Sequence, residues 1–417
     1  MSSIPQPLSA AASAPPAEAR RARAAVAAIF FVNGAVFANV VPRYPEIKAH
    51  LDLSNTALGT AVAGYGLGAL LLGLAAGALL GRWGSARVAW VSTFVVSLNV
   101  VLLGVAPSWW VLAVAMFVAG SADSIADIAV NAHGLRVERL YRRSILNAFH
   151  GLWSVGAVVG GGIGAAAAGL RIPLGWHFCA VAAICAAVAA VLSRYLLSGR
   201  DDRHRAPSGA GAPSGAGAPG GRRATTVRRR RQVGWKIVAL AAISGSAQLV
   251  EDMGATWSAV YLRGELGAAA AVAGLAFIAL QAAQTVGRLL GDRLVTRYGD
   301  RAVARAGATM AALAMAAALA APSIPLTVAA FGVAGLGIGT LIPASLRTVD
   351  ELPGLPPGVG LSLVGVGNRV SLLAAPPLVG VVADLAGLRV ALAIVPLLGA
   401  LVLALSPVLS RARPRLT

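Results

Sequence analysis

Long apolar runs recur along the whole chain, and they constrain its fold more than any other feature. Of the 417 residues, 57% are hydrophobic and only 12% are charged, whereas soluble globular proteins carry about 25% charged residues. A run of about 18 or more apolar residues can cross a bilayer as a helix. We therefore expect an all-helical integral membrane protein with twelve spans, at residues 24–42, 57–80, 88–106, 109–132, 147–169, 174–197, 236–261, 269–290, 302–320, 326–346, 358–382 and 389–409.

The basic residues predict how these spans are oriented. With the N-terminus in the cytoplasm, 28 of the 35 lysines and arginines fall in cytoplasmic segments, which is the bias typical of membrane proteins. We expect both termini to be cytoplasmic and the basic loops to contact anionic lipid headgroups. Although the net charge is +19, we expect no nucleic-acid partner, because the arginines flank spans and form no soluble basic domain.

A polar segment at 198–235 divides the spans into two sets of six. It repeats Pro-Ser-Gly-Ala-Gly-Ala at 207–212 and 213–218 and then carries a run of arginines at 228–231. Segments rich in Gly, Pro and Ser are flexible. We expect a disordered N-terminal segment at 1–23, a six-helix bundle at 24–197, a flexible basic linker at 198–235, a second six-helix bundle at 236–409 and a cytoplasmic tail at 410–417.

One short motif occurs at the loop after the second span of each half. The pattern Leu-x-x-Arg-aromatic-Gly occupies residues 79–84 in the first half and 294–299 in the second. Glycine permits the backbone angles that a tight turn between helices needs, and the arginine can face lipid headgroups or a carboxylate. This internal repeat indicates two related bundles.

The motif resembles a signature of the major facilitator superfamily, Gly-x-Leu-Ala-Asp-Arg-x-Gly-Arg-Lys. Gly77, Leu79, Arg82 and Gly84 match it, while Gly81 replaces the signature acid. With twelve spans and a basic central loop, the resemblance implies two pseudo-symmetric six-helix bundles around a central cavity, with alternating access by rocking of the halves. It also implies a cytoplasmic gate that includes Gly77, Arg82, Gly84, Arg87, Arg297 and Gly299.

Four further stretches resemble a bacterial subgroup of that superfamily, which includes fucose-permease-like proteins and the rhizopine-locus membrane protein. These stretches are Arg43-x-Pro45-x-Ile47-Lys48, Asp127-x-x-x-Asn131 leading into His150-Gly151, Trp257-Ser-Ala-Val-Tyr261-Leu, and Pro376-Pro377-x-x-Gly380.

The fourth span carries three polar residues on one stripe. Asp123, Asp127 and Asn131 lie at i, i+4 and i+8, which places them within about 80° of one another on a helix. Acids inside a span are costly and mark solute or proton paths. Counting about 1.5 Å per residue from the outer end predicts Asp123 on that path, and Asp127 and Asn131 near the cytoplasmic gate. Asp127 could instead pair with Arg82 or Arg87.

The second half has its own ionisable residues within spans. Glu251 and Asp252 fall in the outer half of the seventh span, and neighbouring residues on a helix point about 100° apart, so we favour Glu251 for transport. Arg369 falls close to mid-membrane, where it could neutralise an acid or hold an anionic group of the solute. We expect Asp123 to face Arg369 and Glu251 across the centre of the molecule.

Other polar residues within the spans complete the candidate pathway. His150 could shuttle protons near neutral pH or stabilise packing beside Gly151. Trp257 could anchor the membrane interface or stack on a solute. Further candidates for hydrogen bonds to solute hydroxyls are Asn33, Gln281, Gln284 and Asn368.

The motifs of soluble enzymes are missing from the sequence. It has no phosphate-binding Gly-x-x-x-x-Gly-Lys-Ser/Thr stretch and no Cys/His cluster with metal-ligand spacing, so we expect no enzyme, cofactor or metal site. We expect a monomeric, proton-coupled secondary active transporter of the bacterial cytoplasmic membrane, carrying a small organic solute that is sugar-like or a related metabolite. The alternatives are a proton-driven exporter of a drug or secondary metabolite, and a non-transporting membrane sensor or scaffold.

Overall fold

The computed structural model describes residues 16–141, 145–199, 223–352, 355 and 359–410. Within these residues every regular element is a helix, and twelve helices are long and apolar enough to cross a membrane. The predicted all-helical fold with twelve spans is therefore confirmed. Most of the expected N-terminal segment, the middle of the expected linker and the end of the tail lie outside the described residues.

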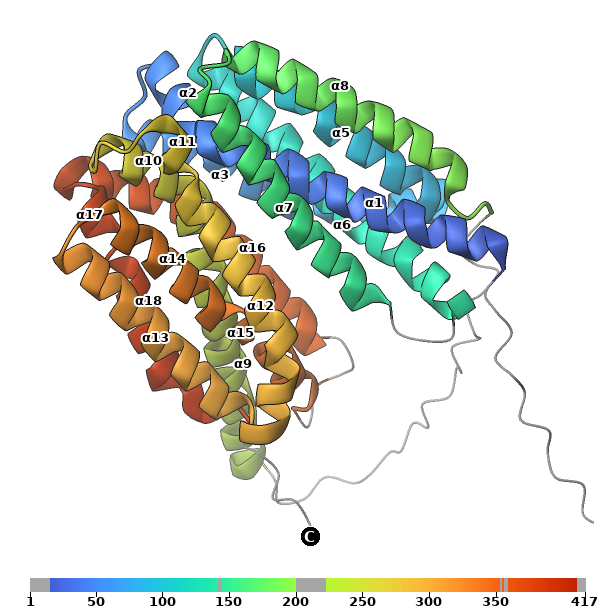
Figure 1. Ribbon diagram of the computed structural model, residues 1–417. Helices are drawn as coiled ribbons and strands as arrows, with labels where there is room; N and C mark the ends of the chain where they lie inside the picture. The colour runs from blue at the N-terminus through green and yellow to red at the C-terminus, as the bar shows by residue number, and fades with distance from the viewer. Residues whose placement is uncertain (1–15, 142–144, 200–222, 353–354, 356–358, 411–417) are drawn as a thin grey trace, which may run out of the picture.

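The N-terminal half contains six spans, coloured blue to green in Figure 1. Prolines lie near the starts of two of its short elements, because proline lacks the N–H that a helix interior needs. The elements are α1 (Ala17–Val40), η1 (Val41–Arg43), α2 (Tyr44–His50), α3 (Asn55–Gly73), α4 (Ala76–Trp83), α5 (Ser85–Val105), α6 (Trp109–Tyr141), α7 (Leu146–Gly169), α8 (Leu174–Leu192) and η2 (Ser193–Tyr195).

The C-terminal half contains the other six spans, coloured yellow-green to red in Figure 1. A π-helical turn, η4, interrupts its first span. The elements are α9 (Arg223–Asp252), η4 (Met253–Trp257), α10 (Ser258–Gly264), α11 (Ala270–Ala273), α12 (Leu275–Tyr298), α13 (Asp300–Ala320), α14 (Ile324–Ile338), α15 (Leu341–Asp350), α16 (Val359–Ala386), α17 (Leu388–Ala391), α18 (Ile394–Leu405) and η5 (Ser406–Val408).

Two helices begin earlier than the sequence predicted. α1 begins at Ala17, although we expected disorder up to residue 23; Glu18 lies in its first turn, where a carboxylate interacts favourably with the helix dipole. α9 begins at Arg223, inside the segment predicted as a flexible linker up to residue 235. Arginine is a good helix former, so the basic cluster at 228–231 extends the seventh span.

The repeated motif forms the same turn in both halves. α4 ends before Gly84, which has φ 79° and ψ 154°, and α12 ends before Gly299, which has φ 81° and ψ 157°. These backbone angles are open almost only to glycine. The internal repeat predicted from the sequence is therefore visible in the backbone.

The two halves meet at one end of the molecule, near α2, α10 and α11, and diverge toward the first turns of α1 and α9 (Figure 1). We call these the joined end and the diverging end. Near the joined end α3 crosses α16 so closely that a Cβ added at Gly59 would lie 2.2 Å from the Pro376 carbonyl oxygen. Asp384 on α16 also accepts the backbone N–H groups of Asn55 and Thr56, at 2.8 Å each. Its carboxylate therefore satisfies free donors in the first turn of α3.

Candidate functional site

A cavity of about 170 Å³ lies between the two halves. Both halves contribute to its wall, so neither bundle forms it alone. This is the position at which transporters built from repeated bundles hold their solutes. The lining residues are Phe37, Tyr44, Val62, Tyr65, Asp123 and Trp153 from the first half, and Gln248, Glu251, Asp252, Ala255, Thr256 and Leu372 from the second.

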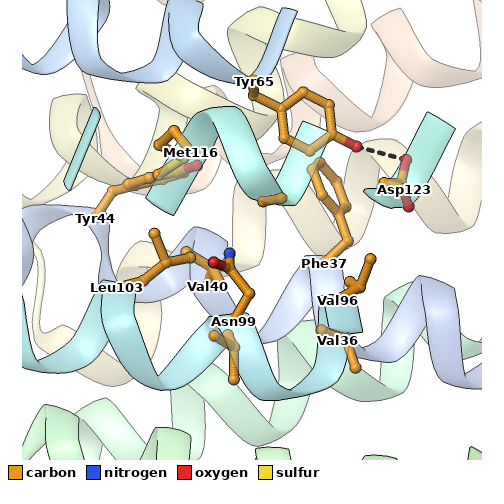
Figure 2. Close-up of a pocket in the computed structure, with 12 residues that line it drawn as sticks. Val36, Phe37, Val40, Tyr44, Tyr65, Val96, Asn99, Leu103, Met116 and Asp123 are labelled. Atoms are coloured by element: carbon orange, nitrogen blue, oxygen red, sulfur yellow. Dashed lines mark hydrogen bonds between the residues drawn. The ribbon is translucent and has the colours of Figure 1, made fainter. Parts of the chain in front are cut away.

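Asp123 is held in this wall by a tyrosine of the neighbouring helix. Tyr65 on α3 donates its hydroxyl to Asp123 on α6, with 2.6 Å between Oη and Oδ2, and Figure 2 shows this pair. The helices can approach because Gly120 precedes Asp123 by almost one turn: a Cβ at Gly120 would lie 1.9 Å from the Tyr65 carbonyl oxygen. The glycine therefore brings the carboxylate within reach of α3.

A smaller space of about 40 Å³ adjoins the cavity inside the N-terminal half. Figure 2 shows its lining, which includes Asn99 and the pair of Tyr65 and Asp123. The amide nitrogen of Asn99 donates to the Ala115 carbonyl at 2.9 Å, while its buried oxygen has no partner. The central cavity thus has a mostly apolar side pocket whose polar side chains include Asn99 and Asp123.

Glu251 lies on the opposite wall and is neutralised by its own half. Gln284 on α12 donates to Glu251 Oε2 at 3.0 Å, and the Arg288 guanidinium lies 4.0 Å from the same oxygen. Both partners come from one helix, one turn apart. Glu251 is therefore part of a charged network with α12.

Asp252 differs from Glu251 in having no cationic partner among the residues that the structure describes. Its side chain accepts a hydrogen bond from Thr256, at 3.1 Å between Oγ1 and Oδ1. The residue is only 5% exposed, and its second oxygen, Oδ2, has no partner. Thr256 belongs to the π-helical turn η4, and such turns occur frequently at functional sites.

A second polar cluster contains three residues that the sequence had singled out. The Asn131 amide donates to Asp127 Oδ1 at 2.8 Å, and the Asn131 oxygen lies 3.1 Å from His150 Nε2. Because that oxygen can only accept, His150 carries its proton on Nε2. Asp127 is also within electrostatic range of Arg369 from the other half. This cluster therefore links polar groups of both halves.

The structure places Arg369 differently from the expected position. We expected it to face Asp123, but Arg369 is not among the residues that line the cavity, and its Nη1 lies against Gly73 near the end of α3. Asp123 and Glu251 do line the same cavity, as expected. The position of the Arg369 side chain depends on how α16 sits against α3, which residue counting along single helices cannot predict.

The other predicted residues occupy several environments. Trp257 is fully buried within η4 and is not among the lining residues, and Asn33 and Gln281 are buried in α1 and α12. Asn368 is half-buried on α16. Each of these four has one buried nitrogen or oxygen without a partner. In the motif loops the glycines at the turns are buried, while the remaining predicted gate residues, Gly77, Arg82, Arg87 and Arg297, are exposed.

Comparison with known proteins agrees with this architecture. A family model described as the Major Facilitator Superfamily matches residues 26–261 and 249–417. An uncharacterized transporter of Sinorhizobium fredii is 29% identical over 386 residues, which cover 93% of this chain and 97% of that protein. The solved nucleoside transporter NupG is 13% identical, with a TM-score of 0.69 over 93% of this chain and 98% of its own.

A second solved structure, a D-xylose-proton symporter, is 14% identical and has a TM-score of 0.68 over 93% of this chain and 96% of its own. Identities at this level show a shared fold, while the family model covers nearly the whole chain. The named relatives are transporters and not enzymes. The chain belongs to the major facilitator superfamily of membrane transporters.

Proposed function

We propose that the protein is a secondary active transporter that carries a small polar organic solute by alternating access and couples this movement to protons. The observation that carries the proposal is the cavity between the halves, with Asp123 on one wall and Asp252 on the other. Rocking of the two bundles can open such a shared cavity to either side of a membrane.

In this proposal the joined and diverging ends correspond to an inward-facing state of the transporter. The predicted orientation puts the diverging end, where α1 and α9 begin, in the cytoplasm. The cavity then faces inward, and the outer side is closed by the α3–α16 crossing and the bond from Asp384 to the start of α3. Opening to the outside requires these contacts to separate.

Protons can neutralise the buried carboxylates of the cavity. Asp123 has Tyr65 as its recorded partner and Asp252 has Thr256, and neither forms an ion pair within the described part of the chain. A carboxylate buried without a cation is strongly destabilised. Binding a proton removes that charge, so protonation of either acid shifts the balance between the two states of the transporter.

Two of the structural relatives support a polar solute. They are a nucleoside transporter and a D-xylose-proton symporter, so this fold accommodates hydroxyl-bearing ring compounds, in one case together with protons. The cavity wall of the present chain likewise combines carboxylates, an amide and a hydroxyl with aromatic rings. The bacterial relative and the twelve spans support a place in the bacterial cytoplasmic membrane.

Flux measurements in proteoliposomes test the proposal. A thermal-shift screen of sugars, inositols, organic acids and antibiotics first identifies compounds that bind the purified protein. With an imposed pH gradient, adding such a compound should change the luminal pH, and the sign of the change distinguishes uptake from export. Asp123→Asn should abolish the proton movement, whereas Asp350→Asn, at an exposed site, should not. Flux without proton movement would exclude coupling, and binding without flux would favour a sensor.

Three separate variants test the division between cavity and gate. Asp123→Asn should remove proton coupling, because this residue lines the cavity. Asp127→Asn and Arg369→Gln change residues that do not line the cavity, so they should slow transport and change solute affinity less than about twofold. An equal loss of solute binding in all three would show that the stripe on α6 acts as one binding surface.

A further inference from the structure

The charged residues around the cavity are distributed unevenly. Three acids line it, whereas none of its lining residues is Arg, Lys or His. Two arginines close to lining residues lie outside the lining: Arg369 comes almost one turn before Leu372 on α16, and Arg288 lies 4.0 Å from Glu251. An anionic solute would therefore meet carboxylates of its own sign within the cavity.

The three acids are not equally compensated. Glu251 already has Arg288 at 4.0 Å and the Gln284 amide at 3.0 Å. Asp123 has a single recorded hydrogen bond, from Tyr65. Asp252 has one from Thr256, and its Oδ2 is buried and unpartnered. Within the described residues two cavity carboxylates thus lack a cation, and one of them keeps a buried oxygen whose charge nothing compensates.

Aromatic rings form the surface beside these carboxylates. Phe37 stacks on Trp153 with 6.4 Å between ring centroids and an interplanar angle of 28°. It also lies 6.3 Å from Tyr65, whose hydroxyl reaches Asp123. Aromatic faces attract ammonium groups through their quadrupole, and they also bury the apolar body of a solute.

We propose that the transported solute carries a positively charged amine, with the ammonium group bound between Asp123 and Asp252 and the body against Phe37 and Trp153. An ammonium supplies three N–H donors, and a buried carboxylate is stable when it is paired and hydrogen-bonded. The inference rests on the proposed function only in assigning this cavity to the solute.

Matched compounds that differ only in charge test this inference. The first set is glucose, glucosamine and glucuronate, with N-acetylglucosamine as an uncharged control; the second is 2-phenylethanol, phenethylamine and phenylacetate. Dissociation constants are measured by tryptophan fluorescence and calorimetry on the purified full-length protein. In at least one set the amine should bind at least about tenfold more tightly than the neutral compound, and the acid should not bind.

Two variants locate the amine. Asp252→Asn removes the charge at its buried oxygen and should weaken amine binding by about tenfold, while binding of the neutral compound changes less than about twofold. Asp350→Asn, exposed on α15, is the matched control and should change neither. An equal effect of both variants would overturn the assigned site.

Binding measurements on the wild-type protein alone can show that the proposed ligand class is wrong. If a neutral or acidic compound is the tightest binder in both sets, or if no amine binds at millimolar concentration, the inference is wrong. Flux assays separate a failure of this inference from a failure of the proposed transport function. Amine binding without flux would support the ligand class and contradict transport. Flux of a neutral compound with no amine binding would support transport and contradict the ligand class.

Discussion

The N-terminal and C-terminal halves place helices at matching positions, and one glycine-mediated helix crossing occurs in both. A constant shift of 215 residues (300 − 85) carries α5, Ser85–Val105, onto α13, Asp300–Ala320. The same shift carries Gly84 onto Gly299, and Gly120 onto Gly335. At Gly335 an added Cβ would lie 2.1 Å from the Leu280 carbonyl oxygen, and Leu280 is the counterpart of Tyr65. The helix crossing that positions Asp123 is thus duplicated in the second half.

The cavity residues do not follow this symmetry. The shift carries Asp123 onto Ile338, which is buried in the apolar core, and it carries Tyr65 onto Leu280. The hydrogen-bonded pair of the first half therefore has an apolar equivalent in the second, where the acids lie on α9 instead. The two halves thus share this helix crossing and the turn at Gly84 and Gly299, whereas their cavity residues differ.

The largest loss of stability is expected from adding a methyl group at the helix crossing that both halves share. Gly120→Ala and Gly335→Ala each place a methyl group within about 2 Å of a backbone oxygen, and overpacking of this kind costs about 1–3 kcal/mol or more. Both variants should lower the thermal stability of the purified protein in detergent by similar amounts. Gly162→Ala is the control, because nothing lies within 4 Å of that position. A loss confined to one half would show that the crossing is not equivalent.

The next largest loss of stability is expected from replacing the glycine of the repeated turn in either half. Gly84→Ala and Gly299→Ala force alanine to adopt φ near 80° and ψ near 155°, which costs about 1–3 kcal/mol. The two losses of stability should agree closely, because the backbone angles do. Gly77→Ala, exposed within α4 with nothing in contact distance, should be neutral or slightly stabilising. Unequal losses would mean that the surroundings of the turn, and not its backbone angles, determine its tolerance.

The sequence could predict what depends on single segments. Twelve apolar runs predicted the spans, and the Leu-x-x-Arg-aromatic-Gly repeat predicted two related halves. The acids Asp123, Glu251 and Asp252 were identified because charge within an apolar run is costly. These features need no knowledge of how one helix meets another.

The cross-helix partners could not be predicted in this way. Tyr65 reaches Asp123 only because α3 and α6 cross at Gly120. Arg43, which belongs to a motif we related to a family subgroup, is fully buried and donates to Glu46 and to the Ile172 carbonyl. The π-helical turn beside Asp252 has no pattern that we could recognise in the sequence. The contacts of Tyr65 with Asp123 and of Arg43 with Ile172 both join segments far apart in the chain.

Asp300 marks a chemical difference at the repeated turn and should give a moderate effect. It follows Gly299 directly, and its side chain accepts from Arg347 at 2.6 Å and from Ser410 Oγ at 2.7 Å. Asp300→Ser gives the second half the residue that the first half has at this position. Because Arg347 is 43% exposed, solvent screens the pair, and we expect a loss of about 1–2 kcal/mol. A thermal melt of the variant in high salt should approach that of the wild type.

The counterpart of Asp300, Ser85, is expected to give the smallest effect. Leu197 N–H donates to His133 Nε2 at 3.1 Å, so His133 carries its proton on Nδ1, 3.0 Å from Ser85 Oγ. Ser85→Ala removes a neutral acceptor of this buried N–H group, which costs about 1 kcal/mol. Unlike the loss in Asp300→Ser, this loss should not depend on salt, because the removed contact joins a serine hydroxyl to the N–H group of a neutral imidazole. Since the two sites lie in different bundles, the losses should add in the double variant. A salt-dependent loss in Ser85→Ala would mean that His133 is charged, and the neutral contact assigned to the first half would then be wrong.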